Sequence, residues 1–363
     1  GRIFRLEWLE RIYEACAPSG GSGVRVILEV VVMGEVSVDA IYRPERDPEL
    51  AALLKANDLT LPEEVDEGVG LYEDGRLVGC GFLKGNLLQG VAVDAAHRGE
   101  GLSATLITAL IQRAVQRGIT YWQVITKPDM ERFFAGLGFR RVADARPYAV
   151  LLEAGSGSAS AYSKGLRRQA EGRPTPRACV VMNANPFTLG HRHLVERAAS
   201  ENPWVWVLAV REDRSEFPFD VRFRLMREGT ADLPNVEVLS GGEYVISART
   251  FPAYFTRQES LAAAQGALDA AVFCDLVAPA LGIARRYVGT EPFSPSTARY
   301  NEALLERLPK CGIQVVVVER ASAGGEAVSA SRVRAAMAAQ DWDTVRAMTP
   351  DSTYRYLRER RPG

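Results

Sequence analysis

The sequence predicts two α/β domains in tandem, a mixed α/β domain followed by a doubly wound parallel sheet. From residue 178 onward, short uninterrupted apolar runs alternate with helical patterns, as in a parallel sheet covered on both faces. Between residues 40 and 153, a hairpin pattern precedes a glycine-rich loop that opens a helix. Residues 154–177 are rich in Gly, Ser, Arg and Pro, which is typical of a flexible, basic linker. We therefore expect domains at 40–153 and 178–363, and an extension without an assigned role at 1–39.

Length and composition are those of an ordinary globular protein. The 363 residues suit about two domains, and a formal net charge of −1 gives no general attraction to nucleic acid or to an acidic membrane. The five cysteines lack a C-x-x-C pair, which suits reduced thiols rather than zinc ligands or disulfides. The apolar run at 24–38 contains three charges and is too short to cross a bilayer, and no signal peptide is visible. We expect a cytoplasmic protein with no nucleic-acid or membrane partner.

The elements of the first domain follow from the spacing of apolar residues. Leu50, Leu53 and Leu54 have helical spacing, and two alternating runs flank the turn at Asp74-Gly75. The expected elements are a helix at 47–57, strands at 68–72, 77–83 and 87–93, a helix ending at 117, a strand at 121–126 and a helix before Phe139.

A glycine-rich loop opens the helix that ends at 117. Glycine lets a backbone approach a bound anion closely, and the first turn of a helix offers amides to a phosphate. The candidates for such a diphosphate loop are Arg98, Gly99, Gly101 and Ser103.

The loop resembles the R/Q-x-x-G-x-G/A loop of the GCN5-related N-acetyltransferases (GNAT), with Arg98, Gly101 and Ser103 at the matching positions. Ser103 departs from the usual Gly or Ala, whereas the G-L-G-F sequence at 136–139 is typical of that fold. The family usually carries a tyrosine acid on the preceding helix, and this chain has Phe133 and Phe134 there. The resemblance therefore implies a site for a CoA-like ligand without independent acetyl transfer to an amine.

The second domain repeats strand and helix after the linker, in which we expect one short helix near 162–170. Strands are expected at 178–182, 204–210, 236–239, 284–289 and 313–318, and helices from about 191, at 219–229 and at 342–357. The carboxyl ends of such strands form the ligand-binding edge of an open sheet.

The first of these strands ends in a short loop that contains Asn185-Pro186 and leads into a helix. Strand, loop and helix in this order aim the helix amides at an anion. Thr188 and His191 lie in its first turn, where a hydroxyl and an imidazole can both face a phosphate. The other residues that we expect to line this site are Asn183, Asn185, Phe187 and Gly190.

Further candidates follow other elements of the second domain. Gly289, Thr290 and Glu291 come at the end of the strand at 284–289, and Arg222 lies in the first turn of the helix at 219–229. Near the C-terminus, the hydroxyls of Ser329 and Ser331 and the guanidinium of Arg334 can hold phosphates, since Ser331 and Arg334 share a helix face; these three complete the candidate set.

Thr188-Leu189-Gly190-His191 resembles the T-x-G-H signature of the nucleotidylyltransferase superfamily, and the stretch 328–334 resembles its second signature. This implies a Rossmann-like nucleotidylyltransferase domain. A nucleotidylyltransferase domain joined to an acetyltransferase-like domain resembles the citrate (pro-3S)-lyase ligase family. Four stretches match that family closely: 181–187, 243–247, 289–293 and 328–334. The resemblance runs from about residue 40 to the C-terminus.

The resemblance implies an ATP-dependent acid–thiol ligase. Such an enzyme activates acetate as acetyl-AMP and acetylates the dephospho-CoA-derived prosthetic group on the acyl carrier subunit of citrate lyase, releasing AMP and diphosphate. Here it implies that Thr188 and His191 contact the α- and β-phosphates, and that Ser329, Ser331 and Arg334 hold the β- and γ-phosphates. Mg²⁺ would bridge phosphate oxygens, with no dedicated protein metal site.

Two alternatives remain open at this point. The same fold and site could transfer AMP to phosphopantetheine or to nicotinamide mononucleotide, which would give a dinucleotide. A regulatory binding protein with two inactive sites is the other alternative, and the intact Thr188, His191, Ser331 and Arg334 argue against it. Either enzyme requires the stretch around residue 191 and the stretch around residue 331 to share one edge of the sheet.

Overall fold

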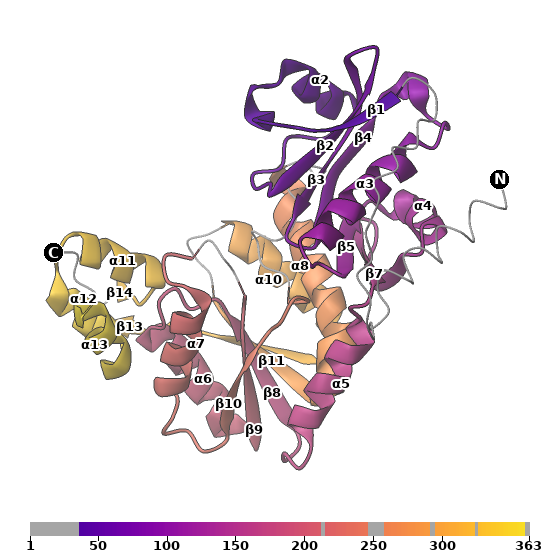
Figure 1. Cartoon of the computed structure of the whole chain (residues 1–363). Helices are drawn as coiled ribbons and strands as arrows, with labels where there is room; N and C mark the ends of the chain where they lie inside the picture. The colour runs from indigo at the N-terminus through magenta and orange to yellow at the C-terminus, as the bar shows by residue number, and fades with distance from the viewer. Residues whose placement is uncertain (1–35, 212–214, 246–257, 291–294, 324–325, 360–363) are drawn as a thin grey trace, which may run out of the picture. The chain divides into compact units, whose positions relative to one another are not determined.

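The computed structural model describes residues 36–211, 215–245, 258–290, 295–323 and 326–359 (Figure 1). The chain divides into a first compact unit, which ends at Ser158 and to which the described residues 258–261 also belong, and a second unit, which begins at Ala159. The mixed α/β character of the first unit and the parallel sheet of the second confirm the predicted fold class.

The first unit is built on a seven-stranded sheet with the order β1-β2-β3-β4-β5-β7-β6. All neighbouring strands are antiparallel except β4 and β5, which pair in parallel only where Leu87 and Leu88 face Gln123 and Val124. The two strands therefore separate toward their carboxyl ends. The strands are β1 (Val36–Ala40), β2 (Glu67–Glu73), β3 (Arg76–Lys84), β4 (Leu87–Val93), β5 (Tyr121–Thr126), β6 (Arg140–Ala145) and β7 (Ala149–Gly155).

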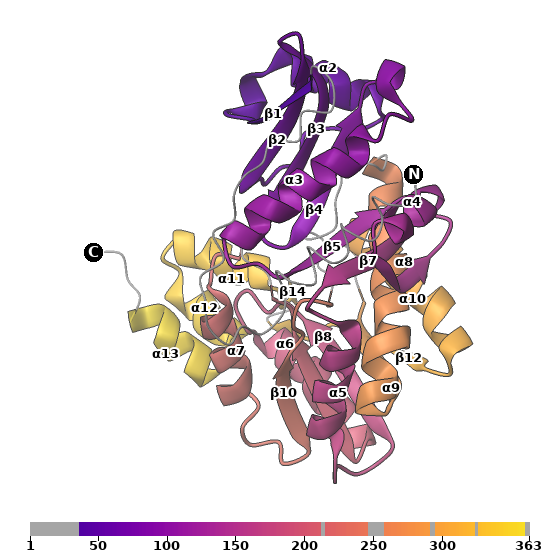
Figure 2. The ribbon, with the colours of Figure 1, turned by 45° about the vertical axis from the view of Figure 1, so that its right-hand side comes forward.

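Helices cover both faces of this sheet because side chains on adjacent strand positions point in opposite directions. Helix α3 (Leu102–Gln116) packs Leu106, Ile107 and Leu110 on the face that carries Val69 and Leu71 (Figure 2). Helix α2 (Pro48–Ala56) packs its leucines on the opposite face, against Leu77, Cys80 and Phe82 of β3. The helices expected at 47–57 and before 117 are therefore confirmed, as is the hairpin of β2 and β3.

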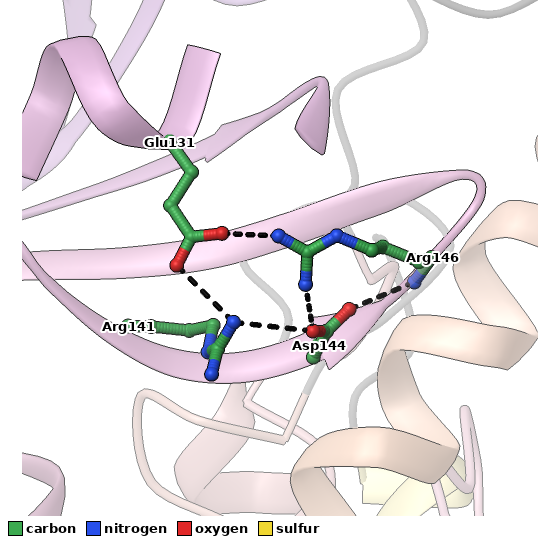
Figure 3. A network of polar contacts seen from close by, with 4 residues as sticks. All are labelled: Glu131, Arg141, Asp144 and Arg146. Carbon is green, nitrogen blue, oxygen red and sulfur yellow. Dashed lines mark hydrogen bonds and ion pairs between the residues drawn. The ribbon is translucent and has the colours of Figure 1, made fainter. Parts of the chain in front are cut away.

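The short helix α4 (Glu131–Gly136) is tied to the hairpin of β6 and β7 by four charged side chains (Figure 3). Arg141 pairs with Glu131 at 3.2 Å and with Asp144 at 3.3 Å, and Arg146 pairs with the same two carboxylates. These groups are partly exposed, so the network contributes modestly to stability. Phe134 of α4 is buried in the core and packs against Phe139. It lies on the helix where the GNAT resemblance would place a tyrosine acid.

The second unit contains a five-stranded sheet with the order β10-β9-β8-β11-β12, and every neighbouring pair is parallel. The strands are β8 (Arg177–Met182), β9 (Trp204–Ala209), β10 (Val236–Ser240), β11 (Ile283–Gly289) and β12 (Gln314–Val318). The chain adds β9 and β10 on one side of β8 and then β11 and β12 on the other side, which makes the sheet doubly wound. The carboxyl ends of β8 and β11 therefore lie side by side.

Alternating side chains of this sheet supply two cores. Val205, Val207 and Ala209 of β9 face α6 (Leu189–Glu201) and α7 (Phe219–Glu228), whereas Trp206 and Leu208 face the other layer. Figure 1 shows α6 and α7 on one side of the strands and α5 (Ala159–Ala170) on the other. The remaining elements of that second layer are α8 (Gln258–Val272), a π-helical turn (Phe273–Val277), α9 (Ala278–Leu281) and α10 (Pro295–Arg307).

Helix α5 confirms the short helix that was expected near 162–170 within the linker at 154–177. Leu166 and Ala170 are buried in the second core, and the Ser163 hydroxyl donates to the Leu276 carbonyl at 3.0 Å. Tyr162 donates to the carbonyl of Gly241 at 2.7 Å. The helix has an amphipathic pattern, and its apolar face is stabilised by burial against the core of the second unit. The pattern of the helix therefore matters more for its position than the composition of the residues around it.

The last described helices are α11 (Ala330–Ala338), α12 (Trp342–Met348) and α13 (Asp351–Glu359), which pack together around Val333, Val345 and Leu357. Among the described residues, the stretch Leu261–Leu281 is long and apolar enough to cross a membrane, with a mean hydropathy of 1.5 over its 18-residue window. Because 61% of that window is buried inside the protein, the stretch serves as a core helix.

Candidate active site

The loop after β8 brings the polar residues to the carboxyl edge of the sheet. It turns at Ala184, whose φ of 49° is left-handed, and Thr188 then caps the N-terminus of α6. The Thr188 hydroxyl accepts the His191 amide at 3.4 Å, and His191 Nδ1 accepts the Thr188 amide at 3.1 Å. This reciprocal pair is a capping box in which histidine occupies the place usually held by Glu or Gln.

The capping box fixes the tautomer of His191. A backbone N–H can only donate, so Nδ1 is an acceptor and the proton of the neutral ring lies on Nε2. Burial, and secondarily the positive charge of Arg320, lowers the pKa of His191 to about 4. Phe187 stacks on the ring, with the two centroids 5.8 Å apart. His191, whose surface stays partly exposed, is therefore a neutral and oriented N–H donor at pH 7.

Two residues predicted to line the site instead support it from below. Thr188 is 1% exposed and Phe187 is 0% exposed, so both side chains lie beneath the surface that a ligand would touch. The Thr188 hydroxyl lies 2.9 Å from Nδ1 of His191. We therefore assign both residues the role of holding His191 in place.

Arg222 is likewise buried, with 0% exposure, and the structure gives it internal partners rather than an open surface. Its Nη1 donates to the carbonyl and side-chain oxygens of Asn183, both at 2.7 Å, and to the Val210 carbonyl at 3.1 Å. Its Nε donates to the Phe217 carbonyl at 3.0 Å. Arg222 thus joins the loops that follow β8 and β9, and sequence position alone could not distinguish this from a ligand contact.

The second motif meets the first at this edge. Ser329 caps α11 by accepting the Arg332 amide at 3.3 Å, and its hydroxyl lies 3.1 Å from that of the exposed Ser331. Arg334 Nη1 donates to the carbonyl of Asn185 at 2.5 Å. A Cβ on Gly190 would come within 3.0 Å of the Val328 carbonyl, so the two motifs are in direct contact.

The end of β11 completes the edge. The Thr290 amide donates to the Val318 carbonyl at 2.9 Å, and the Gly289 carbonyl accepts Asn301 Nδ2 at 3.2 Å. Glu291 lies outside the described residues. Arg320, which sequence reasoning missed, donates from Nε to the Thr290 carbonyl at 2.7 Å. The signal that could have indicated Arg320 was its position two residues after the strand expected at 313–318.

The glycine-rich loop of the first unit forms an open helix N-terminus. Gly99 and Gly101 have φ of 95° and 83°, and a Cβ at either would meet nothing within 4 Å. The amides of Ala104 and Thr105 bond back to the Gly101 carbonyl at 3.0 and 3.2 Å, and Ser103 lies in the first turn of α3. Arg98 reaches Asn57 at 3.3 Å. The left-handed φ values explain why glycine occupies these two positions.

Fold and site together define the class of protein. It is an acetyltransferase-like unit followed by a doubly wound unit of the nucleotidylyltransferase type, whose T-x-G-H turn and C-terminal serine–arginine helix converge. The acetyltransferase (GNAT) family matches residues 55–149, and the family described as the citrate lyase ligase C-terminal domain matches residues 177–357.

Related proteins specify the family further. A citrate (pro-3S)-lyase ligase of Escherichia coli is 37% identical over 316 residues, which cover 85% of this chain and 89% of that protein. One from Klebsiella pneumoniae is 37% identical over 321 residues, or 87% and 93% of the two chains. An L-2,4-diaminobutyric acid acetyltransferase of Streptomyces coelicolor is 33% identical over 118 residues, or 29% and 69%. The chain belongs to the citrate (pro-3S)-lyase ligase family and is an enzyme of the ligase class.

Proposed function

We propose that this enzyme uses ATP to convert acetate into acetyl adenylate and then acetylates the thiol of the dephospho-CoA-derived prosthetic group on the acyl carrier subunit of citrate lyase. The observation that supports this most directly is the hydrogen bond of 2.5 Å from Arg334 to the Asn185 carbonyl. It brings the serine–arginine helix and the T-x-G-H turn within reach of one triphosphate. Family membership supports this choice of acceptor.

In the first step, a carboxylate oxygen of acetate attacks the α-phosphorus of ATP, and the bond from that phosphorus to the diphosphate breaks. Both the attacked phosphate and the leaving diphosphate are anionic, so catalysis consists of positioning and charge stabilisation. His191 donates from Nε2 to the α- or β-phosphate without a net charge of its own. Arg334, Ser329 and Ser331 hold the β- and γ-phosphates and stabilise the charge on the departing diphosphate.

In the second step, the carrier thiol attacks the acetyl carbonyl carbon, the carbon–oxygen bond to AMP breaks, and the thiol proton passes to solvent. No covalent enzyme intermediate is required. Among the described residues, no group of three His, Cys, Asp or Glu side chains could hold a metal ion. In this proposal Mg²⁺ would be carried by the phosphate chain, whose charge it would partly neutralise, with His191, Arg334 and the serines as the protein contacts of that chain.

We further propose that the loop Arg98–Ser103 binds the diphosphate of a CoA-like ligand, such as the arm of the carrier. The open space above Gly99 and Gly101 and the N-terminus of α3 support this. Ser103→Glu should raise the apparent KM for the carrier about tenfold and leave acetyl adenylate formation unchanged, because the added charge repels a diphosphate. Ser103→Gln is the matched control. An equal fall in adenylate formation would refute this division of labour.

The proposed reaction is tested by incubating the protein with ATP, Mg²⁺, acetate and hydroxylamine. Hydroxylamine traps acetyl adenylate as acetohydroxamate, so its formation with release of AMP and diphosphate supports the ligase reaction. A dinucleotide formed from ATP and phosphopantetheine or nicotinamide mononucleotide would instead support plain nucleotidyl transfer. The absence of both products would leave a binding protein.

A further inference from the structure

Gly229, the buried residue that follows α7, lies directly against Phe187, whose ring supports His191. A Cβ on Gly229 would come within 2.6 and 2.7 Å of Cε1 and Cδ1 of Phe187, which is closer than any Cβ approaches a ring carbon. It would also come within 2.9 Å of the Leu225 carbonyl oxygen in the last turn of α7. The φ of Gly229 is −73°, an ordinary helical value, so the backbone does not require glycine. The close approach of the Phe187 ring therefore explains glycine at this position.

Phe187 transmits this contact to His191. Its ring is 0% exposed and stacks on the imidazole, with the two centroids 5.8 Å apart and the ring planes 18° from parallel. Nδ1 of His191 accepts the Thr188 amide at 3.1 Å, so the imidazole is fixed on one face and at one nitrogen. A displaced Phe187 ring would therefore release or turn the imidazole and with it the direction of the Nε2–H bond.

Arg192, the residue after His191 on α6, holds Gly229 in place. Its Nη1 donates to the Gly229 carbonyl at 2.7 Å. Nη1 and Nη2 also donate to the two carboxylate oxygens of Asp232 at 2.8 and 2.7 Å, and Nε donates to Glu196 at 2.7 Å. A guanidinium bound at several points has a defined orientation. Helix α6 thus fixes the end of α7, and the end of α7 supports the ring that packs on the histidine of α6.

We propose that Gly229 is a positioning residue for the reaction, since it lets Phe187 lie against His191 and so directs Nε2–H toward the phosphate chain, while Arg192 keeps Gly229 in that place. This inference rests on the proposed function, which gives His191 its phosphate. Neither Gly229 nor Arg192 belongs to the two sequence motifs.

The first test compares acetohydroxamate formation by full-length variants supplied with ATP, Mg²⁺, acetate and hydroxylamine. Gly229→Ala should form acetyl adenylate about 10- to 100-fold more slowly, because moving a catalytic group by about 1 Å can cost about 100-fold in rate. Gly165→Ala is the matched control, since a Cβ on Gly165 of α5 would meet nothing within 4 Å, and it should keep the wild-type rate. Equal rates for the two variants would overturn the inference.

A double-mutant cycle with Phe187→Leu tests the path of the effect. If Gly229 acts through Phe187, the double variant should be within about twofold of the slower single variant, whereas multiplied losses would refute this path. Arg192→Met adds no atom beside Phe187 and keeps the test available if urea unfolding shows that Gly229→Ala is not folded. It should slow the reaction about tenfold, and Arg192→Lys should recover part of the rate. A wild-type rate in Arg192→Met would refute the role of Arg192.

Nitrogen-15 nuclear magnetic resonance of the imidazoles supplies a readout that a merely structural role would not change. At pH 7.5 the wild-type His191 should carry its proton on Nε2 alone, because the Thr188 amide donates to Nδ1. Gly229→Ala should show a mixture of the two tautomers, with the exposed His193 unchanged. An unmixed Nε2 tautomer in Gly229→Ala would overturn the inference.

The inference and the proposed function fail separately. A wild-type protein that forms no acetohydroxamate, yet whose His191 tautomer responds to Gly229→Ala, would refute the ligase reaction and support the positioning. A protein that forms acetohydroxamate, and whose Gly229→Ala variant keeps both the rate and the tautomer, would refute the positioning and support the reaction.

Discussion

His191 carries two roles that substitution can separate. Its Nδ1 closes the capping box of α6, and its Nε2–H is the donor that we assign to the phosphate. Gln and Glu are the residues that ordinarily close a capping box, so His191→Gln and His191→Glu should both preserve the start of α6. Only Gln also keeps an N–H donor, whereas Glu presents two acceptors and a negative charge. His191→Ala removes both roles.

The magnitudes follow from these contacts. A hydrogen bond to a charged group contributes about 1.5–3 kcal/mol, which corresponds to about 10- to 150-fold in rate. We therefore expect His191→Glu to form acetyl adenylate at least about 100-fold more slowly, since repulsion adds to the lost donor. His191→Gln should stay within about tenfold of wild type. Loss of the cap should lower the stability of His191→Ala by about 1 kcal/mol, and the other two should differ from wild type by less than about 0.5 kcal/mol at pH 7.5.

The assay pairs urea unfolding with initial rates of acetohydroxamate formation for the four proteins. Equal rates for His191→Gln and His191→Glu would refute the donor role, because these side chains differ in little else. Equal stability of His191→Ala and wild type would show that the capping contact contributes nothing, and the assignment of the Nε2 tautomer would lose its basis.

Three further outcomes follow from the same contacts. The pKa of His191 is about 4 in the folded protein and 6.5 ordinarily, so the neutral form stabilises the fold above pH 6.5 and this stability is lost as the pH falls toward 4. Wild type should therefore lose about 2 kcal/mol more of its free energy of unfolding than His191→Gln between pH 7.5 and 5.0. An equal loss in the two proteins would contradict this. Arg334→Ala should slow acetyl adenylate formation about 100-fold or more and lower the free energy of unfolding by about 1–2 kcal/mol, with Arg334→Lys keeping part of both; wild-type rates in Arg334→Ala would exclude it from the site. Gly190→Val should force the two motifs apart, because a Cβ there already lies 3.0 Å from the Val328 carbonyl, and normal ATP affinity in this variant would show that their contact is unimportant.

The sequence predicted the parallel sheet well because its strands are buried on both faces. All five strands of the parallel sheet occur within a few residues of their expected positions, and each reads as a short apolar run. In the first unit, β6 and β7 were missed, as were α8 to α10 in the second. β6 carries exposed arginines and a register shift near Ala143, so its alternation is weak. The stretch Leu261–Leu281 is largely apolar, which hides helical periodicity.

The structure brings the motif residues together as neighbours, whereas their individual roles stay predictions. A pattern that spans Thr188 to His191 records which residue types occur together, and it does not record which of them face solvent. The structure buries Thr188 and Phe187 and leaves His191 partly exposed. Arg222 shows the same limit, because an arginine in a first turn suits a phosphate contact and an interior hydrogen-bond donor equally well.

The sequence does not reveal the order of the strands in the sheet, which decides which residues meet at this site. Arg320 lies well over a hundred residues from His191 and thirty from Thr290, and no sequence motif connects them. The order β8-β11-β12 makes the ends of these strands neighbours, and the bond from Arg320 to the Thr290 carbonyl then fixes the direction of the side chain. Because parallel strands in an open sheet all end at one edge, a residue two positions beyond any of them is a candidate for the site. Motif searches do not examine such positions, and in this protein they include a charge that helps to lower the pKa of His191.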